Sequence, residues 1–125
     1  MGWAVFQPDQ TEWEDRGDGS GRTVARLSDS MTNVRANVWR YPAGARGKRH
    51  ADKVQEETFV ILAGSPSMFL GEPPERVDLS PGSVVVVQPG TPLQIWNHGD
   101  EEATLFIVGA PPEQGGADYL PDVER

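Results

Sequence analysis

The sequence contains no cysteine. A chain without cysteine cannot form disulfides, thiolate zinc sites or iron–sulfur clusters, and it cannot use a cysteine nucleophile. The sequence also has no apolar run near the roughly 18 residues that a membrane-spanning helix needs. Its first ten residues, MGWAVFQPDQ, lack the basic flank and apolar stretch of a signal peptide. We therefore expect a cytoplasmic protein that has no membrane partner.

Basic residues are also scarce, because 11 Lys and Arg stand against 19 Asp and Glu, for a net charge of −8. A protein that binds duplex DNA needs a basic face to displace counterions, so this balance argues against a nucleic-acid partner. The 125 residues suit one domain with one hydrophobic core and hardly allow two. We therefore expect a single domain over residues 1–125.

Helical periodicity is hard to find, whereas the 14 glycines and 11 prolines indicate many turns. Short apolar segments bounded by turn residues predict an antiparallel sandwich or barrel of about nine strands. These segments are residues 3–6, 23–27, 34–41, 58–62, 67–70, 76–79, 84–87, 93–97 and 103–108. The continuous apolar runs 84–87 and 103–108 predict strands that are buried on both faces.

The two ends of the chain differ in composition from the middle. Residues 7–22 are rich in acids and glycine, which predicts a loop or an acidic arm. Residues 110–125 are rich in proline, glycine and acids, which predicts an irregular tail on the surface. The core of the domain is therefore expected at about residues 34–109.

Two spaced motifs lie within this core. The first runs from Gly44 to Gly64 and reads G-x5-H-x-D-x4-E-x6-G. The second begins at Gly82 and reads G-x5-Q-P-G-T-P-L-x3-N, ending at Asn97.

This pair of motifs resembles the two motifs of the cupin superfamily, and especially its small single-domain members. The resemblance implies an all-β fold, the cupin double-stranded β-helix, which is a jelly-roll-like antiparallel barrel with a pocket inside. It also implies a homodimer, for which the apolar strands at 84–87 and 103–108 would suit the interface. Because one fold hosts many reactions, the resemblance transfers the fold better than the chemistry.

The metal-ligand positions depart from the family pattern. Metal-binding cupins hold the ion with two histidines and a glutamate from the first motif and a histidine from the second. Here His50 and Glu57 match, but Asp52 stands at the second histidine position and Leu93 stands at the position of the second-motif histidine. The set implied by the resemblance is therefore reduced to one imidazole and two carboxylates.

Strand geometry brings the same residues together without the resemblance. Residues i and i+2 of a strand point to one face, so His50 and Asp52 project together, and Glu57 can face them from the next strand. Leu93, Ile95 and Asn97 alternate in the same way on a later strand. We expect a ligand pocket that is half polar and half apolar.

Three interpretations of His50, Asp52 and Glu57 remain open. The cluster could hold a divalent metal, for which Mn²⁺, Fe²⁺ or Mg²⁺ suits these hard ligands and Zn²⁺ is a further candidate. It could instead be a polar cluster without an ion, with no cofactor. Two adjacent carboxyl groups that share a proton could also serve as a catalytic acid–base cluster. The metal-free interpretations are favoured, because Leu93 replaces a ligand.

Two further residues are candidates for the pocket. Arg49 lies in the basic segment 46–53, which could attract an anionic ligand or could be a solvated loop. Trp39 lies on the strand before the first motif, where it could face a flat ligand, the core or an interface.

We expect the protein to bind or tailor a small organic molecule, with an anion as one candidate, in a metal-poor, half-apolar pocket. One alternative is a metal-dependent dioxygenase or isomerase that uses the reduced site. Another is a sensor or interaction module without enzymatic activity. The sequence leaves open whether the protein is an enzyme.

Overall fold

The computed structural model describes residues 2–112 and 116–124, and nearly all its regular elements are strands. Two short 3-10 helices, η1 (Pro8–Gln10) and η2 (Leu27–Ser30), are the exceptions within these ranges. Over the same residues, no helix has the length and apolar character needed to cross a membrane. The all-β prediction is therefore confirmed.

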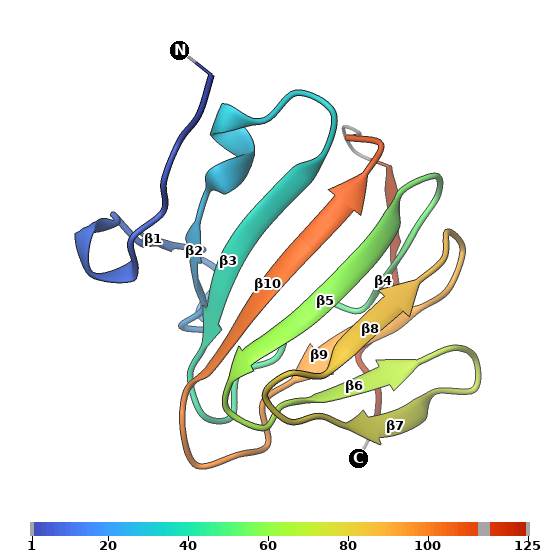
Figure 1. Cartoon of the computed structure of the whole chain (residues 1–125). Helices are drawn as coiled ribbons and strands as arrows, with labels where there is room; N and C mark the ends of the chain where they lie inside the picture. The colour runs from blue at the N-terminus through green and yellow to red at the C-terminus, as the bar shows by residue number, and fades with distance from the viewer. Residues whose placement is uncertain (1, 113–115, 125) are drawn as a thin grey trace.

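The strands form two antiparallel sheets that lie face to face (Figure 1). The larger sheet has the order β1 (Glu14–Asp15), β2 (Thr23–Ala25), β3 (Arg35–Tyr41), β10 (Ala103–Ala110), β5 (Glu56–Ala63) and β8 (Val84–Val87). The smaller sheet has the order β11 (Ala117–Tyr119), β4 (His50–Asp52), β9 (Leu93–Trp96), β6 (Ser67–Leu70) and β7 (Glu75–Asp78). The sheets do not share strands in a closed ring, so the fold is jelly-roll-like rather than a closed barrel.

The core fills the space between the two sheets. Phe59 and Ile61 of β5 meet Met68 of β6 and Leu93 of β9, and each is at most 1% exposed. Burying a side chain of this size contributes about 1.5–3 kcal/mol. The alternation of buried and less buried residues along β5 and β10 follows the period of two that a strand imposes.

Gly64 closes the turn after β5, where the backbone leaves no room for a side chain. Its φ is +81°, and an added Cβ would lie 2.7 Å from the Cα of Ala103. This close approach joins the end of β5 to the start of β10 and accounts for the glycine that ends the first motif.

Two predictions about strands are wrong for the single chain. Val84 and Val86 are 57% and 58% exposed, because β8 is the edge strand of the larger sheet and only one of its faces meets the core. The apolar segment 3–6 forms no strand, and Trp3 is 73% exposed.

Both ends of the chain contribute strands that sequence analysis did not anticipate. Residues 7–22 contain β1, which pairs with β2 at the edge of the larger sheet. The tail contains β11, which pairs with β4 and sets Tyr119 opposite His50. Residues 113–115 of the predicted tail lie outside the described residues.

Candidate functional site

A cavity of about 250 Å³ lies between the two sheets, among the inward-facing side chains of β3, β4, β5 and β9. Its apolar lining includes Phe59, Leu93 and Ile95. Its polar lining includes Asn37, His50 and Glu57. A pocket lined by both polar and apolar side chains is therefore present in the fold.

His50, Asp52 and Glu57 converge in this cavity. The Nε2 atom of His50 lies 3.6 Å from Oδ2 of Asp52 and 3.4 Å from Oε1 of Glu57. The three side chains are 23%, 15% and 12% exposed. Alternation along β4 points His50 and Asp52 the same way, and β5 brings Glu57 to them from the opposite sheet.

The ring of His50 is oriented by a backbone contact. Its Nδ1 lies 3.0 Å from the carbonyl oxygen of Lys48. A carbonyl oxygen only accepts hydrogen bonds, so Nδ1 carries hydrogen and donates it to Lys48. The Nε2 atom is then left to face the two carboxyl groups, either with a second proton or with a free lone pair.

Charge and hydrogen bonding favour the protonated ring. Burial opposes the charge, but the hydrogen bonds to Glu57 and to the Lys48 carbonyl, with the charges of Glu57 and Asp52, raise the pKa of His50. Burial likewise works to raise the pKa of Glu57, but hydrogen bonds from His50 and Asp52, with the charges of His50 and Arg35, lower it overall.

Four cationic side chains also line the cavity: Arg16, Arg22, Arg35 and Lys48. Arg16 and Arg22 lie over the ring of Trp39, at 5.4 Å and 5.3 Å from its centroid. Arg22 is paired with Asp18 at 2.8 Å, and the other three cations still outnumber the two carboxyl groups of the cluster. The whole chain, by contrast, carries a net charge of −8. The cavity is therefore a locally cationic site in an acidic protein.

Arg22 and Tyr41 form a buried pair in the wall. They are 6% and 3% exposed, and Nη1 of Arg22 donates to the hydroxyl oxygen of Tyr41 over 3.2 Å. The other two guanidinium nitrogens of Arg22 also donate, Nε to the hydroxyl oxygen of Ser20 and Nη2 to a carboxylate oxygen of Asp18. Because Tyr41 accepts from Arg22, its own hydroxyl hydrogen is directed elsewhere. Burial raises the pKa of Tyr41, although the charge and hydrogen bond of Arg22 act against the rise.

The structure brings together most of the residues proposed from the sequence. His50, Asp52, Glu57, Trp39, Leu93 and Ile95 all line the cavity.

Arg49 and Asn97 do not line the cavity, contrary to expectation. Arg49 directly precedes His50, the first residue of β4, and its side chain points away from the cavity and reaches Glu72 over 3.1 Å. Asn97 is fully buried, and its Nδ2 donates to the carbonyl groups of Tyr41, Pro42 and Glu101. Asn97 therefore holds together the turn after β3 and the turn between β9 and β10.

The cavity is also lined by Arg16, Arg22 and Tyr119, which are not predicted from the sequence. All three come from the end segments that were interpreted as an arm and a tail. Pairing of β1 with β2 and of β11 with β4 carries them to the cavity. Their only sequence signal is that Arg16 and Arg22 are basic residues inside an acidic segment.

The donor set of the cluster fits a divalent cation. One oxygen or nitrogen atom from each of His50, Asp52 and Glu57 lies within 4.8 Å of the others. The hydrogen bond to Lys48 leaves Nε2 of His50 as the atom that would bind the ion, which is a common way to orient a ligating histidine. One imidazole and two carboxylates form a hard ligand set that suits Mn²⁺, Fe²⁺ or Mg²⁺.

The described residues thus form a jelly-roll-like fold of two antiparallel sheets with a cavity between them. The family model for the cupin domain matches residues 37–109, which is more than half of the chain. The protein belongs to the cupin family. No curated protein matches the chain.

Solved structures agree with this fold. The polyketide cyclase RemF from Streptomyces resistomycificus has a TM-score of 0.81 at 14% identity, covering 98% of this chain and 88% of its own. A sugar phosphate isomerase of the cupin superfamily from Silicibacter pomeroyi has a TM-score of 0.76 at 22% identity, covering 87% and 76%. A predicted oxalate decarboxylase from Thermotoga maritima has a TM-score of 0.76 at 20% identity, covering 87% and 100%. At these identities the likeness establishes the fold alone.

Proposed function

We propose that the protein binds a small organic anion in the cavity and presents it to the His50, Asp52 and Glu57 cluster. The observation that carries this proposal is the gathering of Arg16, Arg22, Arg35 and Lys48 around one cavity of an acidic chain. Cations arranged in this way attract an anion and raise its local concentration.

The rest of the wall favours an organic anion over a simple inorganic one. Phe59, Leu93 and Ile95 provide apolar surface in the same cavity. Burying ligand carbon against such a wall contributes about 25 cal/mol per Å² of apolar area. A molecule with a carboxylate at one end and a flat or apolar body at the other uses both walls.

The cluster could then act on the bound molecule by moving a proton. His50 in its protonated form holds hydrogen on both ring nitrogens, and Nε2 faces the cavity beside two carboxyl groups. A charged imidazole next to a substrate oxygen can donate a proton, and Glu57 or Asp52 can accept one. Proton transfer to or from a bound organic anion is thus the chemistry that these residues support.

Isothermal titration calorimetry with benzoate tests binding. Neutral benzamide serves as the uncharged control ligand, and acetate serves as the smaller anion without a ring. We expect benzoate to bind more tightly than benzamide, because benzamide lacks the charge, and more tightly than acetate, because acetate lacks the ring. Arg35→Ala and Lys48→Ala should each weaken benzoate binding about 3- to 10-fold, which corresponds to roughly 1 kcal/mol per contact.

Arg76→Ala is the matched control, because Arg76 lies on β7 and pairs with Asp78 away from the cavity. It should leave the affinity for benzoate unchanged. Equal binding of benzoate and benzamide, or an equal loss in all three variants, would contradict the proposal.

A divalent cation at the cluster is a second candidate function, favoured by the convergence of three donor atoms within 4.8 Å. Bound there, the cation would supply Lewis-acid or redox chemistry next to the same cavity. His50, Asp52 and Glu57 would hold it through one imidazole and two carboxylate groups. Leu93 occupies the neighbouring position opposite His50 in the β4–β9 pairing and contributes no ligand.

Titration with Mn²⁺ separates this candidate from a metal-free cluster. If the cluster holds the cation, Glu57→Ala should abolish binding. Glu56→Ala should not affect it, because Glu56 lies next in sequence but is exposed and bonded to Gln88. Binding that survives in the Glu57→Ala variant would rule the cluster out as the metal site.

A further inference from the structure

Every second side chain of β3 faces the cavity, and one of them, Asn37, has no part in the proposed attraction of an anion. Arg35, Asn37, Trp39 and Tyr41 alternate along the strand, and all four line the cavity. Asn37 is only 7% exposed. Buried polar groups are as a rule hydrogen-bonded, so the partners of this amide show what else the cavity recognises.

Ser28 fixes the orientation of the Asn37 amide. The backbone nitrogen and the hydroxyl oxygen of Ser28 lie 3.2 Å and 2.9 Å from Oδ1 of Asn37. A backbone N–H only donates, so the atom that faces Ser28 is the oxygen, and Nδ2 is turned away from Ser28. Within residues 2–112 and 116–124, Nδ2 has no hydrogen-bond partner. Asn37 thus supplies a fixed donor to a ligand in the cavity.

A second buried amide, that of Gln55, also lines the cavity and is 8% exposed. Its Nε2 donates to the carbonyl oxygen of Pro111 over 3.0 Å. A carbonyl oxygen only accepts, so Oε1 is the other end of the amide. In the part of the chain that the structure describes, Oε1 has no hydrogen-bond partner. Gln55 thus supplies an acceptor.

Gly109 lets the amide of Gln55 lie between a cation and the acidic cluster. A Cβ on Gly109 would collide with the side chain of Gln55, so the missing side chain leaves the space that Gln55 fills. In the strand pairing, Gly109 stands opposite Arg35 on β3 and opposite Glu57 on β5. The acceptor of Gln55 therefore lies close to the cation that can hold a carboxylate.

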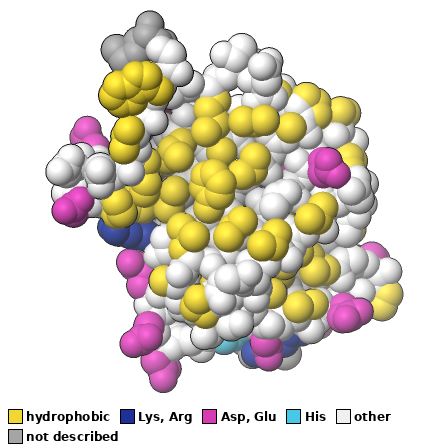
Figure 2. Space-filling model, viewed as in Figure 1, with side chains coloured by type: hydrophobic (Ala, Val, Ile, Leu, Met, Phe, Trp, Pro, Cys, Tyr) yellow, Lys and Arg dark blue, Asp and Glu magenta, His cyan; other side chains and the backbone are white. Residues whose placement is uncertain are grey.

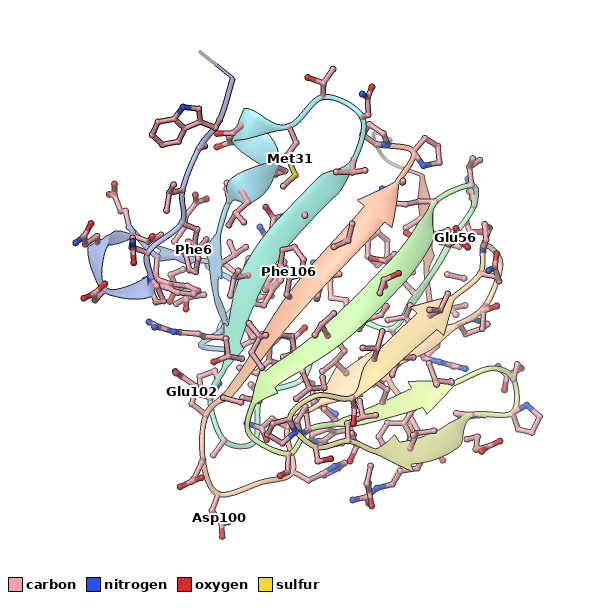
Figure 3. All side chains as sticks on the ribbon, viewed as in Figure 1. Phe6, Met31, Glu56, Asp100, Glu102 and Phe106 are labelled. Atoms are coloured by element: carbon pink, nitrogen blue, oxygen red, sulfur yellow. The ribbon has the colours of Figure 1, made fainter. Side chains whose placement is uncertain are left out.

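Asn37 is the next inward-facing residue after Arg35, about 6.8 Å further along β3. It stands opposite Ile107 of β10. Figure 3 shows Phe106 on the outer side of β10, and alternation turns its neighbour Ile107 to the cavity. The outer side of the same sheet is largely hydrophobic (Figure 2). The two amides are therefore a feature of the cavity side alone.

We propose that the bound anion is a 2-hydroxy carboxylate, whose hydroxyl group is recognised by Asn37 and Gln55. This inference rests on the proposed function, because Arg35 holds the carboxylate. A hydroxyl oxygen accepts hydrogen bonds and its hydrogen donates one, so it matches both Nδ2 of Asn37 and Oε1 of Gln55. A hydroxyl on the carbon next to the carboxylate lies near Arg35, where both amides are.

The two amides also select against acids that lack this hydroxyl. Such an acid removes water from both amides and leaves their polar atoms unpaired, which costs free energy. A 2-oxo carboxylate is an intermediate case, because its carbonyl oxygen accepts from Asn37 but offers no hydrogen to Gln55. Affinity should therefore fall from the hydroxy acid to the oxo acid to the unsubstituted acid.

Isothermal titration calorimetry with mandelate, benzoylformate and phenylacetate tests this order. The three anions share a phenyl ring and a carboxylate, and they differ only in the hydroxyl, carbonyl or methylene group between them. We expect the better-bound enantiomer of mandelate to bind at least about 10-fold more tightly than phenylacetate, with benzoylformate between them. Equal affinities for the three anions would overturn the proposal.

Two variants assign the two contacts separately. Asn37→Leu should weaken mandelate and benzoylformate about 3- to 10-fold each, because both ligands lose the Nδ2 donor. Gln55→Met should weaken mandelate by a similar factor and leave benzoylformate unchanged. Both variants should keep phenylacetate within about 2-fold of wild type. A merely structural role of either residue would weaken all three ligands alike, and this result would overturn the proposal.

Asn33→Leu is the matched control, because Asn33 is exposed, precedes β3 and is not among the residues that line the cavity. It should change none of the affinities. Circular dichroism and thermal unfolding show that each variant is folded. A preference for mandelate that survives in both folded cavity variants would also overturn the proposal.

Neutral phenylacetamide separates this proposal from the proposed function. If all three acids bind more tightly than phenylacetamide but mandelate has no advantage, the cavity binds anions and the recognition of a hydroxyl group is wrong. If the acids bind no more tightly than phenylacetamide, both proposals are wrong.

Discussion

Nε2 of His50 lies 3.4 Å from Oε1 of Glu57, while Nδ1 of the same ring donates to the carbonyl oxygen of Lys48. The two contacts act together, because the backbone contact fixes hydrogen on Nδ1 and leaves Nε2 to face the carboxylates. The nearby carboxylates favour positive charge at Nε2. Either protonation of the ring or a bound metal ion can supply that charge.

We expect His50 to titrate above its ordinary pKa of 6.5 in protein stripped of metal by a chelator. Burial works against the shift, but Glu57 and the Lys48 carbonyl outweigh it. Glu57→Gln should lower the pKa of His50, because the neutral amide removes the carboxylate charge. NMR titration of the two histidine rings measures this, with His98 as the internal control. A pKa of His50 at or below 6.5 in the wild type would contradict the arrangement.

The same pair makes stability depend on pH. His50 has a raised pKa, so its contribution to the free energy of unfolding is complete below about pH 6.5 and is lost as the pH rises through the raised value. Glu57 has a lowered pKa, so its contribution is present above its ordinary value of 4.5 and is lost as the pH falls through the lowered one. The stability difference between wild type and His50→Gln, measured by urea unfolding, should therefore shrink at high pH. A difference that grows at high pH would contradict this linkage.

Tyr41 should ionise at a higher pH than an ordinary tyrosine. Burial raises its pKa, and the charge and hydrogen bond of Arg22 only reduce the rise. The chain has two tyrosines, so a pH titration followed by absorbance near 295 nm contains at most two tyrosine transitions. Tyr41→Phe should remove the component with the higher midpoint, and Tyr119→Phe should leave that component in place. Loss of the high-pH component in Tyr119→Phe would show that the assignment is wrong.

Gly64 and Gly82 provide a comparison of backbone strain with close contact. Both have a positive φ, at 81° and 92°, but only at Gly64 would an added Cβ meet backbone atoms within 3 Å. We expect Gly82→Ala to cost about 1–2 kcal/mol from the φ alone. Gly64→Ala should cost clearly more, because the turn must move away from Ala103. Urea unfolding of both variants measures the difference, and equal losses would contradict it.

The short strands predicted an antiparallel β fold, and the resemblance of the two motifs to those of cupins predicted its jelly-roll form. Alternation along β4 predicted which side chains share a face there. Residues i and i+2 on β4 face one way, so His50 and Asp52 could be placed together and Arg49 could have been placed outside. The basic composition of residues 46–53 predicts Arg49 in the pocket, but the direction of its side chain next to His50 takes it away from the cavity. The spacing of the motifs also anticipated Glu57 opposite His50.

The rest of the site depends on pairing between distant segments. Arg16 and Arg22 reach the cavity because β1 and β2 extend the larger sheet, and no local pattern in residues 7–22 shows this. Tyr119 reaches His50 through the pairing of β11 with β4. The apolar run at β8 predicted burial that one chain does not provide, because sequence patterns do not distinguish burial by the same chain from burial by a partner.

The proposed binding of an organic anion in the cavity can be tested most directly by locating the anion on the protein. NMR titration of ¹⁵N-labelled protein with benzoate locates the binding site directly. We predict that the largest shifts occur in backbone amides of β3, β4 and β5 next to Arg35, Lys48 and Glu57, and that benzamide produces much smaller ones. Shifts confined to the exterior, or none at about 20 mM benzoate, would contradict the claim.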